Sequence, residues 1–227
     1  MSKKKIAFFS FIILLIILAS ILSMVFATNE NNTNLNNEKI DAEIKYLDEK
    51  FSNIYKELLI DGLRVDWNKM QEPIKEIYSS WNSIIIDLNN LQIKNLDLIN
   101  FGKKVDEISI YINEKNTNNV LLSISDLYSL LAIYTNSYNS NVDIKTKINS
   151  KYYLIKAYSL TNTDNWVLIN ENIAKAEKIN LDYITNIDNN YNISRIYVSI
   201  KELENSINLK NKEIFKMKLN IVLEKLD

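Results

Sequence analysis

From residue 38 onward, apolar residues recur along the chain at alternating spacings of three and four. The first stripe shows the pattern, with Ile40, Ile44, Leu47, Phe51 and Ile54 in sequence. An α-helix has about 3.6 residues per turn, so this spacing places the apolar side chains on one face of a helix. A half-buried strand would instead alternate at every second residue, and no window does so. The pattern predicts an all-α body, a bundle of antiparallel amphipathic helices over residues 38–227.

The stripes predict eight helices separated by polar turns. Their apolar positions extend over residues 40–58, 67–91, 98–112, 120–138, 144–158, 166–176, 193–207 and 215–226. The fifth helix either follows a turn or continues the fourth through residues 139–141. The turn at 161–164 separates the fifth helix from the sixth, and Asp164 is the expected capping residue.

Three further residues set the expected boundaries of the second and third helices. Asp66 is the expected N-cap of the second helix, because its side chain can accept a hydrogen bond from a backbone N–H of the first turn. Pro73 lies inside the second stripe, so it either kinks that helix or marks a late start at Glu72. Asp97 is the expected cap of the third helix.

Residues 1–27 have a different pattern, in which Lys3, Lys4 and Lys5 precede an apolar run over 6–27. The run reaches the length of about 20 residues that a membrane-spanning helix needs. It therefore predicts a signal anchor, with the lysines cytoplasmic and the body extracytoplasmic. A signal peptide cleaved after Ala27 is the alternative, since Val25 and Ala27 fit a cleavage site, and the body would then be secreted. The Asn-rich segment 28–37 is the expected flexible spacer.

The two halves of the body resemble each other in layout. Apolar and Asn positions from Ile112 to Leu131 correspond to those from Ile207 to Leu226 at a constant offset of 95 residues. This correspondence suggests a duplication with sub-repeats 38–139 and 142–227. Periodic helices also align by chance, so the single bundle domain 38–227 is the alternative.

Composition excludes several classes of chemistry. The chain contains neither histidine nor cysteine, which rules out Ser-His-Asp and Cys-His catalysis, disulfides, lipid attachment through cysteine and His-based metal or haem sites. With 27 basic and 28 acidic residues and three of the lysines ahead of the apolar run, the body is mildly acidic and does not suggest a nucleic-acid partner. The sequence indicates no cofactor, no metal and no catalytic residue.

Aromatic residues supply the only candidate binding site. Six tyrosines lie on the predicted fourth and fifth helices, and a groove between these helices would use their phenol groups at its rim. They are Tyr128, Tyr134, Tyr138, Tyr152, Tyr153 and Tyr158. Packing in the core is the alternative for these residues, as it is for the three tryptophans, which lie on or begin apolar stripes.

The sequence also resembles a group of uncharacterised exported helical proteins of spore-forming Gram-positive bacteria. The residues that carry the resemblance are Asp66-Trp67, which begin a helix, Trp81 further along it, and the looser match Asn165-Trp166. The resemblance implies repeated helical hairpins behind an N-terminal anchor or lipid attachment, and no known activity.

These observations predict a membrane-tethered extracytoplasmic helical interaction module of the cell envelope, without catalytic activity. Its partner would be an envelope protein, a wall component or a second copy, and the oligomeric state is open. A small-ligand binding domain with a tyrosine-lined groove is the first alternative. A carboxylate-dependent envelope hydrolase is the second, because glycoside hydrolysis needs neither His nor Cys.

Overall fold

The computed structural model describes residues 36–59, 65–186 and 191–227, with side chains from 195 onward in the last range. The chain divides into two compact units, Met1–Lys39 and Ile40–Asp227. The predicted anchor 1–27 and most of the predicted spacer 28–37 lie outside the described residues, while residues 36 and 37 already belong to the first helix. Among the described residues, no helix is both long and apolar enough to cross a membrane.

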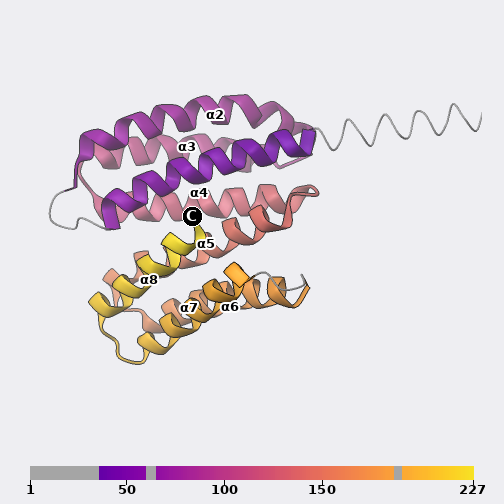
Figure 1. Ribbon diagram of the computed structural model, residues 1–227. Coiled ribbons are helices and arrows are strands. Elements are labelled where there is room, and N and C mark those ends of the chain that lie inside the picture. The colour runs from indigo at the N-terminus through magenta and orange to yellow at the C-terminus, as the bar shows by residue number, and fades with distance from the viewer. Residues whose placement is uncertain (1–35, 60–64, 187–190) are drawn as a thin grey trace, which may run out of the picture. The chain divides into compact units, whose positions relative to one another are not determined.

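Every regular element in the described ranges is helical, so the body is all-α as its periodicity predicts (Figure 1). A first helix over residues 36–59 is followed by the 3₁₀ turn η1 and by helices α2 to α8. Their bounds are Trp67–Met70 for η1, Gln71–Asn90 for α2, Asn95–Asn113 for α3, Thr117–Ser137 for α4, Val142–Leu160 for α5, Thr161–Thr163 for the 3₁₀ turn η2, Trp166–Asn186 for α6, Tyr191–Ile207 for α7 and Lys212–Leu226 for α8.

Helices that follow one another along the chain pack side by side, and α5 also contacts α8. The first helix lies beside α2, α3 and α4, whereas α6 and α8 pack on α5 and α7 packs on α6 and α8 (Figure 1). Helix α4 occupies the middle, between α3 and α5, and for this reason it has buried residues on most of its circumference. The apolar stripes of all these helices meet in one hydrophobic core.

Aromatic side chains form the centre of this core in the first half. The rings of Trp81 and Phe101 stack with centroids 4.0 Å apart, and Tyr134 lies against both. Trp67 packs on the same core from η1, and Trp166 meets Phe215 edge to face in the second half. All three tryptophans therefore contribute to packing.

The structure resolves the two alternatives at Pro73. Asp66 accepts a hydrogen bond from the Asn68 backbone N–H at 3.2 Å, and so it caps η1 rather than the α-helix. Helix α2 begins at Gln71, which places Pro73 in its first turn, where a residue without an N–H is tolerated. The second helix has a late start, one residue before the expected Glu72.

Two predicted caps are wrong by a short distance along the chain. Helix α3 begins at Asn95, so Asp97 lies inside its first turn, where a carboxylate still favours the positive end of the helix dipole. At the start of α6, Asp164 is in the left-handed conformation with φ of 54°, and Asn165 accepts from the Leu168 N–H instead.

The fourth and fifth helices are separate, because Asp41 of the first helix fixes the turn between them. Its carboxylate accepts hydrogen bonds from the Tyr138 hydroxyl at 2.6 Å, the Ser140 hydroxyl at 2.6 Å and the Asn141 N–H at 2.9 Å. Tyr138 is extended and Asn141 caps α5 through the N–H groups of Asp143 and Ile144. A contact from a distant helix thus decides a boundary that local sequence left open.

The α3–α4 and α7–α8 turns have the same local structure. Lys115 and Lys210 both adopt positive φ, 56° and 47°, and the asparagine after each caps the next helix. Asn116 accepts from the Asn119 N–H and Asn211 from the Ile214 N–H, at 3.2 and 3.1 Å. The duplication into 38–139 and 142–227 stays a prediction, which this likeness of the two turns favours.

Candidate functional site

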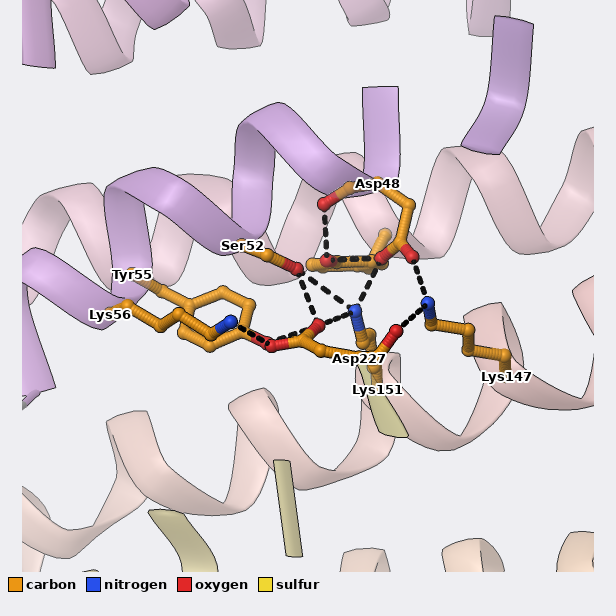
Figure 2. Close-up of polar contacts among 8 residues, drawn as sticks. Asp48, Ser52, Tyr55, Lys56, Lys147, Lys151 and Asp227 are labelled. Carbon is orange, nitrogen blue, oxygen red and sulfur yellow. Dashed lines mark hydrogen bonds and ion pairs between the residues drawn. The ribbon is translucent and has the colours of Figure 1, made fainter. Parts of the chain in front are cut away.

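A lysine with no exposed surface lies where the first helix, α5 and the residue after α8 meet. The ammonium of Lys151, on α5, is 2.7 Å from Asp48 Oδ1 and contacts Asp227 Oδ1 as well (Figure 2). Ser52 Oγ accepts a third hydrogen bond from it at 2.9 Å. Burying an ammonium without partners would cost several kcal/mol. These three acceptors compensate that cost and stabilise the buried lysine.

The first helix supplies most of these partners from one side. Asp41, Asp48, Ser52 and Tyr55 are spaced by seven, four and three residues and therefore share a face of the helix. We call these four residues the polar seam. It lies next to the apolar stripe of the same helix and turns toward α4 and α5, where all four residues are buried. Buried polar groups need hydrogen-bond partners, and every member of the seam has one.

Asp48 has a distinct donor on each carboxylate oxygen. The Tyr128 hydroxyl donates to Oδ1 at 2.7 Å, and the Lys147 ammonium lies 2.9 Å from Oδ2. Burial, and next the charge of Asp48, raise the pKa of Tyr128 well above its ordinary value. Tyr128 is therefore a neutral phenol, whose hydroxyl donates a hydrogen bond to Asp48.

Asp227 receives donors from the first helix and α5. Ser52 donates at 2.8 Å, the Tyr55 hydroxyl reaches both carboxylate oxygens at 3.1 Å, and the Lys56 ammonium lies 2.7 Å from Oδ2. Burial alone would raise the pKa of the Asp227 carboxyl. The charge of Lys151 and the hydrogen bonds from Lys151, Lys56 and Ser52 outweigh burial and lower that pKa to about 2.

A cavity of about 330 Å³ opens beside this cluster, between the first helix and α5. Its walls carry charges of both signs from Lys45, Lys56, Lys147, Asp48, Asp143 and Asp227. Asp48 and Asp227 thus have one side toward the buried Lys151 and another toward the cavity.

The lowered pKa of Asp227 predicts a loss of stability in acid. A carboxylate whose folded-state pKa lies below its ordinary 3.8 adds stability above that value, and the contribution disappears as the pH falls through about 2. Urea unfolding of the wild type and of Asp227→Asn at about pH 5 and about pH 2 tests this. We expect the wild type to be the more stable protein at the higher pH and the difference to shrink at the lower one. A difference that is independent of pH would contradict the role given to Asp227.

The six predicted groove tyrosines do not share one surface. Tyr128 and Tyr134 are fully buried, and the Tyr134 hydroxyl donates to the Asp97 carbonyl at 3.0 Å. Tyr138, Tyr152, Tyr153 and Tyr158 are partly exposed and pack against the core.

The partly exposed tyrosines have different neighbours. The Tyr152 and Tyr153 rings are 4.6 Å apart, and the ammonium of Lys175 lies over Tyr153. Tyr158 has Lys216 of α8 over its ring. None of the six lines the cavity beside Lys151, so a tyrosine groove stays a prediction, and the charged cluster is the site that sequence reasoning missed.

Comparison with protein-family models, with curated proteins and with solved structures finds no match to this chain. Within the described ranges, His, Cys, Asp and Glu side chains form no group suited to hold a metal ion.

Proposed function

We propose that the chain is a membrane-tethered, extracytoplasmic module of the bacterial cell envelope that binds another envelope protein and performs no catalysis. The apolar run 6–27 behind three lysines supports the tether, and the all-helical body supports a binding role. The observation that carries the proposal is the outward side of α3.

Helix α3 exposes aliphatic residues on the side that faces away from the core, with the exposed Lys103 and Asp106 between them. Leu98, Phe101 and Val105 point into the core, whereas Leu96 and Ile99 in the first turns are 65% and 61% exposed. Ile110 continues the outer side further along and is 53% exposed. A surface helix normally has charged or polar residues there. We call Leu96, Ile99 and Ile110 the outer stripe of α3.

The outer stripe fits an apolar helix face on a protein of the same membrane. Its side chains are aliphatic and uncharged, and residues three apart on a helix form the anchors of helix-on-helix recognition. The tether would hold the body close to its membrane, so a partner embedded there would be met at high effective concentration. A second copy of the chain is the competing occupant and a separate outcome of the test.

Site-specific photo-crosslinking in cells tests the proposal. A photoreactive residue at position 99 of the full chain should give an adduct with one membrane-embedded protein, while the same residue at Val167 should not. Val167 is the matched control because it is 70% exposed on α6. Leu96→Ser should weaken the captured complex about 10-fold without changing helical content, as loss of one buried apolar anchor does.

Three outcomes would contradict the proposal. They are equal labelling at positions 99 and 167, an adduct of the chain with itself, and no adduct at position 99.

A further inference from the structure

We propose that Lys151 and Asp48 condense to an isopeptide bond, a covalent amide that joins the first helix to α5. The proposal rests on the contacts of the buried cluster and is independent of the proposed partner binding. It gives the chain a modification site formed by its own side chains.

The nucleophile and the electrophile are already in contact and out of water. Lys151 Nζ is 2.7 Å from Asp48 Oδ1, and their side chains are 0% and 5% exposed. Holding two reactants in fixed contact removes the entropy that a bimolecular condensation would lose. Exclusion of bulk water also favours a reaction that releases water.

Two donors stand where the reacting carboxyl needs them. The Tyr128 hydroxyl, 2.7 Å from Oδ1, would stabilise the negative charge that develops on that oxygen when Nζ adds to Cγ. The Lys147 ammonium, 2.9 Å from Oδ2, would stabilise the oxygen that leaves. Each carboxylate oxygen of Asp48 therefore has a separate function.

Asp227 completes the set as the proton acceptor. It contacts the Lys151 ammonium directly and is itself held by Ser52 and Lys56, so its carboxylate faces the amine in a fixed position (Figure 2). The rings of Tyr55 and Tyr128 have their centroids 5.9 Å from Nζ and restrict its movement.

The step balances without any other reactant. The Lys151 ammonium gives up two protons, with Asp227 as the relay, and the bond from Nζ to Cγ forms. The bond from Cγ to Oδ2 breaks, and Oδ2 leaves with both protons as one water molecule. Oδ1 remains as the amide carbonyl and keeps its hydrogen bond from Tyr128. The water leaves through the cavity that Asp48, Lys147 and Asp227 line.

The bond would tie together residues that are 103 positions apart and belong to the two halves of the body. Such a link limits how far α5 can separate from the first helix. A chain without cysteine has no disulfide available for this purpose.

Mass spectrometry of the full-length chain tests the proposal. The wild type should be lighter by one water than the mass calculated from its sequence. Lys151→Arg, which shares any N-terminal processing, should show no such loss from its own calculated mass. Arginine keeps the positive charge and does not condense, and equal circular dichroism of the two proteins serves as the folding control. Tryptic digestion should yield one branched peptide, residues 46–50 joined through Asp48 to residues 148–156 through an uncleaved Lys151.

Two further variants identify the atoms involved. Asp48→Asn should lose ammonia in place of water, because the side-chain amide nitrogen is then the leaving group. Asp227→Ala should leave a larger share of uncrosslinked chain after expression, which reports its function as base. Three results would overturn the proposal: a wild-type mass equal to that of the sequence, a lost water without the branched peptide, or a branch at Lys147 instead of Lys151.

Discussion

In the chain whose Lys151 and Asp48 have not condensed, replacement of Lys151 by methionine is expected to lower the free energy of unfolding by about 3 kcal/mol. The change keeps the length of the side chain but removes the ammonium that compensates Asp48 and Asp227. Removing one partner of a buried ion pair typically costs about 3–5 kcal/mol, because the other charge stays buried. We expect the lower end of this range, since Lys147 and Tyr128 still bind Asp48 and Lys56 still binds Asp227.

The measurement is urea unfolding monitored by circular dichroism, with Lys201→Met as the control. Lys201 also contacts two carboxylates, Glu177 and Glu204, but its side chain is 45% exposed. Pairs of this kind contribute little to stability, because solvent and salt screen them. Equal losses in the two variants would show that Lys151 is no more important than a surface lysine.

The lysine could have been noticed in the sequence, although its partners could not. On α5 the apolar positions Ile144, Ile148 and Ile155 are spaced by four and then seven, and Lys151 fills the missing place in the stripe. A pattern of apolar residues alone treats that position as a gap. A charged residue in the middle of a buried face is a signal that a carboxylate must lie opposite.

The identity of that carboxylate depends on how distant helices pack. Asp48 is 103 positions from Lys151, and no local rule sets the register of the first helix against α5. A one-turn shift of the first helix would bring Ser52 and Tyr55 toward Lys151 in place of Asp48 and Ser52. The polar seam therefore has a physical use in fixing this register, as buried polar groups do in some helical assemblies.

Features that depend on neighbouring residues alone could be predicted from the sequence. The helical periodicity gave the all-α class and placed the stripes, because each helix must bury an apolar face whatever its neighbours are. The start of α2 near Pro73 followed from the missing N–H of proline alone. The break between α4 and α5 did not, because its cause is the distant carboxylate of Asp41.

The aromatic centre of the core also combines positions that the sequence predicts with contacts that depend on helix packing. Sequence spacing placed Phe101, Trp81 and Tyr134 on apolar stripes, but their mutual contact needs three helices in register. The three rings contact one another, and Phe101, which has no exposed surface, also lies against the ring of Phe51. Truncation of the Phe101 side chain should therefore lower the free energy of unfolding more than truncation of other residues in the first half.

Phe101→Ala is expected to destabilise the body by about 4 kcal/mol, within the range of about 3–5 for buried Phe→Ala changes. The variant loses the stacking on Trp81 and leaves a cavity between α2, α3 and α4. Urea unfolding followed by tryptophan fluorescence measures the loss. Ile99→Ala is the matched control on the same helix: its side chain is 61% exposed, so we expect a change below about 1 kcal/mol. If the two variants unfolded at the same urea concentration, the assignment of Phe101 to the core and of Ile99 to the outer stripe would be wrong.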